Sequence, residues 1–346
     1  MAKSYPQVDA TKRPSINDVA LAAGVSRSAV SKVLRDAYGV SPIMRAKVEA
    51  AIHKLGYRPR TGARAMRGQT HLIGVAIPQL TNTFFSQIIT GIQKRLDGTD
   101  YNMVVTPPTH NMELRQAMLA LVDHQVDGII AIAPEVSPVD LNQIAIHTPL
   151  VMIGRHDKTY SYDTVVGDDY AGTNQVVDHL IAMGHKRICH LTIRPTYDQE
   201  DARQPHTLRC EAFEKRMTAA GLEQQLALCA GAEETDAYNA TLDLLAKPNR
   251  PTAIFAGNDT LAIGALRALA EQGISSDQMA VVGYDDIDVA SHPMISLSTV
   301  SQFGEQLGKK AVDLLLERIE DNRDAPHQLQ ITPALKIRGT SNKTFK

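Results

Sequence analysis

The chain has 346 residues, which is long for one hydrophobic core and predicts two or three domains. Its 43% hydrophobic and 21% charged residues are typical of a globular protein, and no apolar run reaches the roughly 18 residues that a membrane helix needs. The first residues lack the apolar stretch of a signal peptide, so we expect a cytoplasmic protein. The three cysteines, Cys189, Cys210 and Cys229, lie far apart, which argues against disulfide scaffolds and zinc fingers.

The charges are unevenly distributed along the chain. Residues 1–70 carry 13 Lys and Arg against 4 Asp and Glu, a net charge of +9, whereas the other residues carry 23 against 34, a net charge of −11. A basic head on an acidic body suits a protein that meets polyphosphate at one end. A merely solvated basic face would have the same charge, so the charge alone does not identify the partner.

The basic head, residues 15–57, has the pattern of a helix-turn-helix. A capping box of Ser15 and Asp18 predicts a first helix that stops at Gly24, and Ser26 caps a second helix. Opposite its apolar side, the second helix carries a stripe without acidic residues: Arg27, Ser28, Ser31, Lys32 and Arg35. A third helix follows Ser41 and ends at residue 56. A generic three-helix unit is the alternative, and the basic stripe argues against it.

Residues 58–69 are basic and poor in bulky apolar side chains, which predicts a linker, and residues 1–14 are expected to form a flexible tail. Behind the linker, short apolar runs alternate with helix-length stretches. The runs are 72–77, 103–105, 128–133, 150–153, 187–191, 253–256 and 280–283, and the stretches include 85–96, 114–124, 172–183, 208–220, 238–245 and 259–272. This alternation predicts an α/β core with two doubly wound parallel-sheet lobes.

Polar and aromatic residues follow several of these runs. They include Asn82, Phe84, Phe85, Arg155, Asp168, Asp169, Asn258, Asp259 and Asp285. In parallel sheets, ligands bind beyond the carboxyl ends of the strands, where such side chains suit a polyhydroxylated ligand. Taken singly, each of the aspartates is better explained as a helix cap or a surface charge than as a ligand contact.

The run from Ile16 to Leu34, INDVALAAGVSRSAVSKVL, resembles the opening signature of the lactose/galactose repressor (LacI/GalR) family, with Ala29 where Thr is usual. The segments FAGNDTLAIG at 255–264, VVGYDD at 281–286 and LSTV at 297–300 also resemble that family. Residues 208–213 match it less well, because Ala212 stands where Gly is usual. The resemblance covers residues 15 to about 340 and implies a periplasmic-binding-protein-like core.

The resemblance implies roles for residues of the head and the linker. Base reading in the major groove would fall to Arg27, Ser28 and Lys32, and Ser26 and Ser31 would lie near phosphate. The linker at 58–69 would act as a hinge that enters the minor groove with Ala63, Arg64 and Met66. The partners implied are pseudo-palindromic double-stranded operator DNA and a second copy of the chain, in a homodimer without a tetramerising C-terminal helix.

The resemblance also implies an effector site and the path of the chain between the lobes. The effector-binding candidates, with Arg155 added from its place after a strand, are Phe84, Phe85, Arg155, Arg209, Asn258, Asp285 and Gln302. Within a core at 70–340, the first lobe would hold about 70–167 and 298–330, and the second about 168–297 and 331–340. Crossings are expected near Gly167, Leu297 and Ile331.

We therefore expect a transcriptional repressor of a carbohydrate-related operon, controlled by a sugar, sugar acid or polyol. A corepressor-dependent regulator or activator that responds to a nucleobase or a sugar phosphate is the alternative, because the sign of the coupling between two sites is not a motif. An enzyme is not expected, because no phosphate loop, nucleophile elbow or His-x-x-x-His pair occurs. No cofactor or metal is expected. A solute-binding transport protein is also not expected, because it would need a secretion signal and would have no DNA-reading head.

Overall fold

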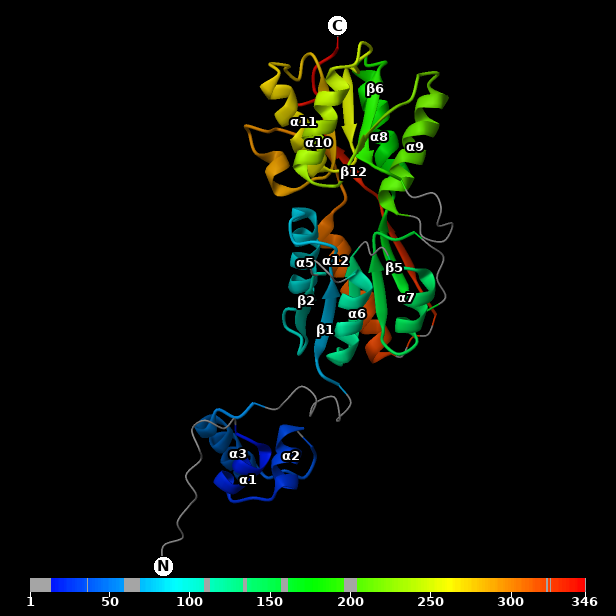
Figure 1. Cartoon of the computed structure of the whole chain (residues 1–346). Coiled ribbons are helices and arrows are strands. Elements are labelled where there is room, and N and C mark those ends of the chain that lie inside the picture. Colours follow the sequence, from blue (N-terminus) through cyan, green and yellow to red (C-terminus); the bar gives the residue numbers. More distant parts are fainter. Residues whose placement is uncertain are drawn as a thin grey trace, which may run out of the picture. The chain divides into compact units, whose positions relative to one another are not determined.

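The computed structural model describes residues 14–345, apart from residues 36, 59–68, 109–112, 133–135, 157–160, 196–203, 322 and 324. The chain divides into two compact units, Met1–Thr70 and His71–Lys346 (Figure 1). We refer to them as the head and the core.

The head contains the three expected helices, α1 (Ile16–Ala23), α2 (Arg27–Leu34) and α3 (Pro42–Leu55). Ser15 and Asp18 form both hydrogen bonds of a capping box, and Gly24 ends α1 in the left-handed conformation with φ 66°. The hydroxyl of Ser26 accepts a hydrogen bond from the amide of residue 29 and caps α2. The three helices close over a small apolar core that includes Val19, Val30, Val33, Val48 and Ala51. The predicted helix-turn-helix is confirmed.

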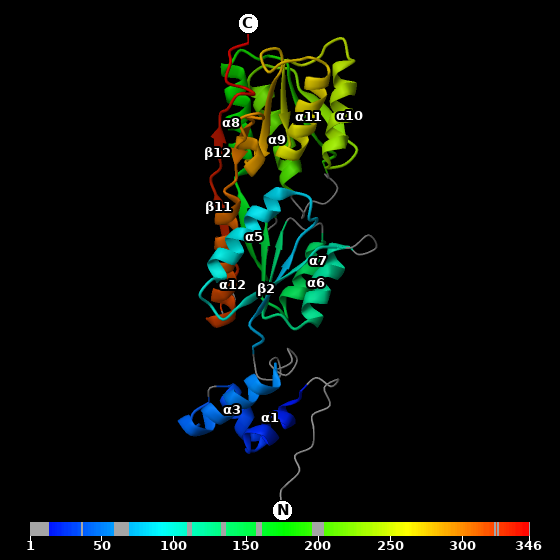
Figure 2. The same ribbon diagram turned by 90° about the vertical axis from the view of Figure 1, so that its left-hand side faces the viewer.

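The first lobe of the core is built on a parallel sheet with the strand order β11-β5-β4-β3-β1-β2. Its strands are β1 (Leu72–Ala76), β2 (Asn102–Thr106), β3 (Gly128–Ile132), β4 (Leu150–Ile153), β5 (Asp163–Gly167) and β11 (Gln328–Ile331). Helices α5 (Thr83–Leu96) and α12 (Gly304–Glu320) cover one face, and α6 (Leu114–Asp123) and α7 (Pro138–Ala145) cover the other (Figure 2).

The second lobe has the strand order β12-β10-β9-β8-β6-β7, and only β12 is antiparallel to its neighbour. Its strands are β6 (Ile188–Ile193), β7 (Gln225–Cys229), β8 (Ala253–Ala256), β9 (Ala280–Asp285), β10 (Ser298–Ser301) and β12 (Ala334–Lys336). Helices α8 (Asp169–Ala182) and α9 (Pro205–Ala219) pack on one face, and α10 (Glu234–Leu245) and α11 (Asp259–Glu271) on the other. A 3-10 turn, η1 (Asp288–Ser291), follows β9. The predicted pair of doubly wound lobes is confirmed.

The chain crosses between the lobes three times, after β5, after β10 and after β11. The second crossing differs from the sequence-based expectation near Leu297. Residues 298–301 form β10, which pairs with β9 and β12 in the second sheet, so they belong to the second lobe and not to the first. The crossing falls instead between Ser301 and Gly304, where Phe303 takes the left-handed conformation with φ 55°.

Helices α5 and α12 approach each other unusually closely. A Cβ atom added at Gly91 of α5 would lie 2.1 Å from the backbone oxygen of Glu305, and one added at Gly308 of α12 would lie 2.2 Å from that of Ile88. Neither position has room for a methyl group, so both glycines are required by the contact. The two helices therefore pack backbone to backbone.

The C-terminal segment is packed against the second lobe. The side chains of Thr340 and Ser341 are buried. The amide of Phe345 donates to the carbonyl of Met183 at 2.7 Å, and its ring lies 5.0 Å from that of His185.

A buried carboxylate, Asp163, joins three segments of the first lobe at the start of β5. Its side chain is fully buried and accepts hydrogen bonds from Arg318 Nε at 2.9 Å, from Arg323 Nη2 at 2.6 Å and from the amide of His327 at 2.6 Å. Burial raises the pKa of Asp163, but these donors outweigh it and hold the pKa below its ordinary value. The cluster connects β5 with the end of α12 and the approach to β11.

We expect Asp163→Ala to lower the free energy of unfolding by about 3 kcal/mol or more, because it leaves buried guanidinium groups without their carboxylate. Since the folded-state pKa is depressed, the stabilisation is present above the ordinary pKa of Asp and is lost as the pH falls below it. Urea denaturation followed by circular dichroism measures both effects. The control is Asp313→Ala, which removes a partly exposed pair with Arg95 and should cost less than about 1 kcal/mol. Equal losses in the two variants would contradict this role.

Candidate functional site

The outer side of α2 presents the predicted DNA-reading residues. Arg27, Ser28 and Lys32 are exposed, and the buried residues Val30 and Val33 lie on the opposite side of the helix. This arrangement leaves charged and hydroxyl donors along the second helix of a helix-turn-helix, which is the element that enters the major groove.

Two predicted phosphate contacts have local partners in the structure. The Ser26 hydroxyl accepts from the amide of Ala29 at 3.1 Å and lies 2.8 Å from the hydroxyl of Ser28. Ser31 is half-buried, and its carbonyl accepts from Arg35 Nε at 3.1 Å. Ser26 therefore acts first as a helix cap. The predicted hinge residues Ala63, Arg64 and Met66 lie outside the described residues.

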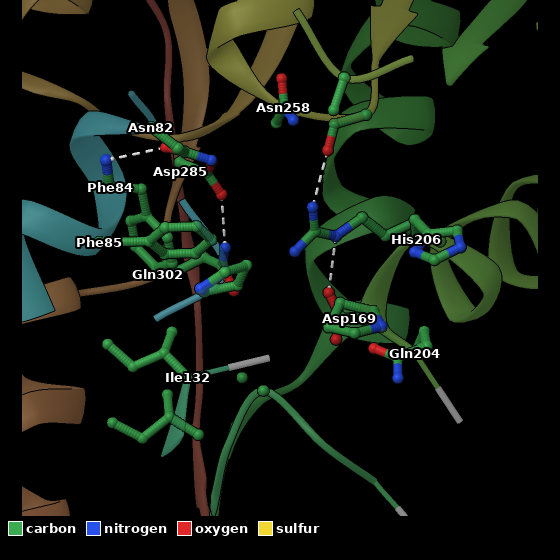
Figure 3. Close-up of a pocket in the computed structure, with 18 of the residues that line it drawn as sticks. Asn82, Phe84, Phe85, Ile132, Asp169, Gln204, His206, Asn258, Asp285 and Gln302 are labelled. Atoms are coloured by element: carbon green, nitrogen blue, oxygen red, sulfur yellow. Dashed lines mark hydrogen bonds and ion pairs between the residues drawn. The ribbon is translucent and has the colours of Figure 1, made fainter. Parts of the chain in front are cut away.

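The core contains a cavity of about 290 Å³ at the carboxyl ends of strands from both sheets. Phe84, Phe85, Ile132 and Ile153 line it from the first lobe, and Asp169, Thr192, Gln204, His206, Arg209, Asn258 and Asp285 line it from the second. Gln302, at the second crossing, lines it as well. In Figure 3, Phe84, Phe85, Asp285 and Gln302 lie on one side of the open space, and Asp169, Gln204 and His206 lie on the other.

Arg209 of α9 is the main positive charge of the cavity wall. Its guanidinium donates from Nε to Asp169 at 2.7 Å and from Nη1 to the carbonyl of Gly257 at 2.7 Å. The same group stacks over the ring of Tyr284 at 3.8 Å. Burial lowers the pKa of Arg209, but the negative charge of Asp169 outweighs it and raises the pKa, so the guanidinium stays charged. Its orientation is fixed from three directions.

Asp285, the last residue of β9, faces Arg209 from the other side of the cavity. One carboxylate oxygen accepts from Gln302 Nε2 at 2.6 Å, and the backbone has the unusual φ of 121°. Burial raises the pKa of Asp285 to about 7, and Arg209 and Gln302 compensate only in part. This carboxyl group therefore changes charge near neutral pH.

Asp259 lies behind Asp285 and does not line the cavity. It is fully buried and accepts from the hydroxyl of Thr299 at 2.5 Å and from the amide of Ile287 at 2.9 Å. Burial and the neighbouring charge of Asp285 raise its pKa well above the ordinary value. Its part is to hold the loop after β9, whereas Asn258 caps α11 and also reaches the cavity.

Six of the predicted effector-binding residues line this one cavity: Phe84, Phe85, Arg209, Asn258, Asp285 and Gln302. Arg155 does not line it, contrary to the sequence-based prediction. The chain turns at Gly154, with φ 73°, and the fully buried guanidinium of Arg155 donates to the carbonyl of Val136 at 2.5 Å. A position next to the end of a strand did not predict a cavity-lining side chain here, because the turn at Gly154 directs the side chain of Arg155 into the first lobe.

The prediction also left out residues that line the cavity. Asp169 stood among the residues after a strand, but nothing local separated it from a helix cap. Gln204 and His206 lie at the start of α9, far in sequence from any strand end, and His206 is kept neutral because burial and then Arg209 lower its pKa to about 4. Only the folded chain brings them to the cavity.

In the described part of the chain, no group of three or more His, Cys, Asp or Glu side chains has the arrangement of a metal site. No helix there is long and apolar enough to cross a membrane.

Comparison with known proteins identifies the family. Residues 15–60 match the model for bacterial regulatory proteins of the lacI family, and residues 177–341 match that for a periplasmic binding protein-like domain. The ribose operon repressor of Escherichia coli (strain K12) is 33% identical over 334 residues, which cover 94% of this chain and 99% of that protein. The chain belongs to the LacI family. It is a DNA-binding transcriptional regulator with an effector-binding core, as the sequence resemblance implied.

Solved structures of LacI-family proteins have the same fold. The lac repressor dimer bound to operator and the anti-inducer ONPF matches with a TM-score of 0.80 and 29% identity, covering 95% of this chain and 99% of that one. A LacI-family transcriptional regulator from Enterococcus faecium with bound ribose matches with a TM-score of 0.70 and 26% identity, covering 80% of this chain and all of the other. The two-lobed core is therefore that of known effector-binding regulators.

The ring of Tyr284 stacks against the guanidinium of Arg209, and the Tyr284 side chain also packs tightly against α8. A Cβ atom at Gly172 would lie 2.2 Å from Tyr284 Oη. We expect Gly172→Ala to lower the free energy of unfolding by roughly 1–3 kcal/mol through overpacking. The matched control is the double variant Gly172→Ala/Tyr284→Phe, which removes the nearest clashing atom, the hydroxyl oxygen, and should regain part of the loss in urea denaturation, since the ring carbons Cζ and Cε2 still lie 2.9 and 3.0 Å from the added Cβ atom. A double variant as unstable as Gly172→Ala would show that the clash is not with this hydroxyl.

Proposed function

We propose that this LacI-family chain is a cytoplasmic repressor of carbohydrate-related genes. It acts as a homodimer on a pseudo-palindromic operator, with Arg27, Ser28 and Lys32 reading bases in the major groove and the segment around Met66 entering the minor groove. The exposed basic side of α2 and the head charge of +9 support this role. It works by binding rather than by catalysis, and its relatives are likewise named as repressors.

The effector that we propose is a neutral monosaccharide, with ribose as the first candidate. The observation that carries the proposal is the pairing of a fixed donor, Arg209, with a facing acceptor, Asp285, across a cavity whose remaining wall includes Phe84 and Phe85. Sugars offer hydroxyls that donate and accept, and apolar C–H faces that pack on aromatic rings. The name of the Escherichia coli relative and the ribose bound by the Enterococcus faecium regulator support the same class.

The size and charge of the cavity narrow the choice of effector further. About 290 Å³ lies at the small end of ligand sites, which favours one sugar ring over two. Among the lining residues that the structure describes, Arg209 is already bonded to Asp169 and Asp285 adds a second acid, so a sugar phosphate or sugar acid would meet carboxylates there without a spare cation. A neutral ligand avoids this repulsion.

A planar nucleobase is the second candidate, because Phe84 and Phe85 both line the cavity. Their rings are inclined by 51° with centroids 6.3 Å apart. Two parallel faces on either side of a base would need another geometry, so this pair offers one stacking face at most.

The proposal is tested by a thermal-shift screen of monosaccharides, disaccharides, sugar phosphates and purines, followed by operator binding with and without each hit. We expect a neutral monosaccharide to raise the melting temperature and to weaken operator binding, since an inducer binds one lobe arrangement preferentially. Tighter operator binding with the ligand would replace the induced repressor by a corepressor-dependent one. Stabilisation by purines alone would overturn the carbohydrate assignment.

The head generates its own prediction. Arg27→Ala should weaken binding to the cognate operator by roughly 10- to 100-fold and relax the preference for the base pair that it contacts, as expected when a bidentate base contact is lost. Lys186→Ala, which removes one exposed positive charge from the core, is the control and should leave operator affinity unchanged. Equal weakening on specific and unrelated DNA would assign Arg27 to phosphate instead.

The pKa of Asp285 makes effector binding depend on pH. Sugar hydroxyls donate to the carboxylate, so binding favours the ionised form. Because the pKa of the empty site is raised to about 7, affinity should fall by up to about tenfold per pH unit below that value and be constant above it. Calorimetric titration from roughly pH 5.5 to 8.5 measures the slope.

Asp285→Asn should bind more weakly and without this pH dependence. His206→Gln is the control and should keep the slope, because His206, with a pKa of about 4, does not titrate in this range. A slope that survives in Asp285→Asn would assign the proton to another group.

A further inference from the structure

One hydrogen bond joins the two lobes beside the cavity. His156 follows β4 in the first lobe, and its Nε2 lies 2.9 Å from Asp169 Oδ2 at the start of α8 in the second lobe. The two side chains are 14% and 2% exposed, so the bond is shielded from water. Since Asp169 is an acceptor, His156 donates.

The other oxygen of the same carboxylate holds the effector-facing arginine. Asp169 Oδ1 accepts from Arg209 Nε at 2.7 Å, so a continuous chain runs from His156 through Asp169 to Arg209. Asp169 and Arg209 line the cavity, but His156 does not. Among the described residues, the route from His156 to a ligand therefore runs through Asp169.

Other hydrogen bonds between the lobes do not involve the cavity cation. Gln87 of α5 donates from Nε2 to the carbonyl of Asp286 at 2.9 Å and to Asp288 Oδ1 at 3.3 Å, and the hydroxyl of Thr81 donates to Glu233 at 3.5 Å. These bonds bridge the lobes without touching Arg209. Of the bridges described here, the one at His156 alone reaches a group that faces the ligand.

We propose that His156 is a positioning residue that holds Asp169 and, through it, Arg209 in the orientation that receives the effector, and that it does so only while the lobes keep this arrangement. Effector binding and the approach of the lobes then reinforce each other. The proposal depends on the proposed function only in taking this cavity as the effector site.

The physical basis is the hydrogen-bonding capacity of a buried carboxylate. Its two oxygens are satisfied by Arg209 and His156, and the loss of one donor leaves a buried oxygen without that bond. The carboxylate can then rotate toward the remaining guanidinium, which changes the angle of Arg209 to the cavity. In agreement, burial raises the pKa of Asp169, but Arg209 and His156 together lower it below the ordinary value.

The first experiment measures D-ribose affinity by calorimetry for His156→Ala, His156→Gln and a control, His147→Ala. His147 is an exposed histidine of the first lobe. We expect about tenfold weaker binding for His156→Ala, the scale of one hydrogen bond to a charged group. His156→Gln places an amide nitrogen near the position of Nε2 and should recover most of the affinity, and His147→Ala should match the wild type. Wild-type affinity in His156→Ala would overturn the proposal.

The second experiment needs no effector. Urea denaturation of His156→Ala, Asp169→Asn and the double variant forms a double-mutant cycle. We expect the two substitutions to be coupled, so that the double variant is clearly more stable than the sum of the single losses predicts. Additive losses would overturn the inter-lobe bond whatever ligand the protein binds. If D-ribose fails to bind the wild type while the cycle shows coupling, the ribose assignment fails and the bridge between the lobes stands.

Discussion

A guanidinium buried between two lobes needs a carboxylate beside it, and the ligand-binding part of the core is arranged around that requirement. Arg209 is 6% exposed, and its partner Asp169 is 2% exposed. Removing either charge from water costs several kcal/mol, which is recovered only with good geometry and further hydrogen bonds. The carbonyl of Gly257 and the ring of Tyr284 provide the remaining contacts to Arg209. Residues at the ends of β8 and β9 in the second sheet therefore supply the contacts that compensate for burying this ion pair.

The opposite side of the cavity follows a different rule. Among the described residues, Asp285 has no cation as close as Asp169 has, so burial keeps its pKa near neutrality. Its left-handed neighbour Asp286 and the left-handed Phe303 lie at the ends of β9 and β10, which pair with each other. Unfavourable backbone conformations of this kind persist only where the surrounding structure enforces them, and they gather at binding sites. The cavity wall thus combines the charge of Arg209, which Asp169 compensates, with the charge of Asp285, which changes near neutral pH.

Much of the architecture was predictable because its determinants are local. The caps of the head depend on residues three positions apart, such as Ser15 and Asp18, and the buried strands β1, β3 and β4 are continuous apolar runs. The strands that the pattern did not reveal are shorter or more polar: β5 begins with Asp163, which needs Arg318 from a distant helix, and β11 alternates exposed and half-buried residues.

The same distinction between local and tertiary determinants explains which cavity residues could be predicted from the sequence. Helix α12 begins after a phenylalanine that makes no side-chain cap, so its start lacks a signal in the sequence, and the second crossing was accordingly placed too early. Phe84, Asn258 and Gln302, which the family resemblance put forward, line the cavity and stand next to strand ends. Arg155 does not line the cavity because a glycine turn redirects the chain, and His156 and His206 reach the site through tertiary contacts that no local motif indicates. Residues that depend on tertiary contacts have no local pattern.

The close packing of α5 on α12 has a consequence for how this protein changes over time. Helix α5 carries Phe84 and Phe85, and α12 begins directly after the crossing at Gln302 and Phe303. Neither Gly91 nor Gly308 has room for a methyl group, so the two helices are held backbone to backbone, and we expect the aromatic wall and the crossing to move together. Substitutions of lining side chains can then alter which ligand is preferred without altering how lobe movement is transmitted. In evolution, the ligand preference can therefore change without a change in how lobe movement is transmitted, and the transmission can change without a change in ligand preference.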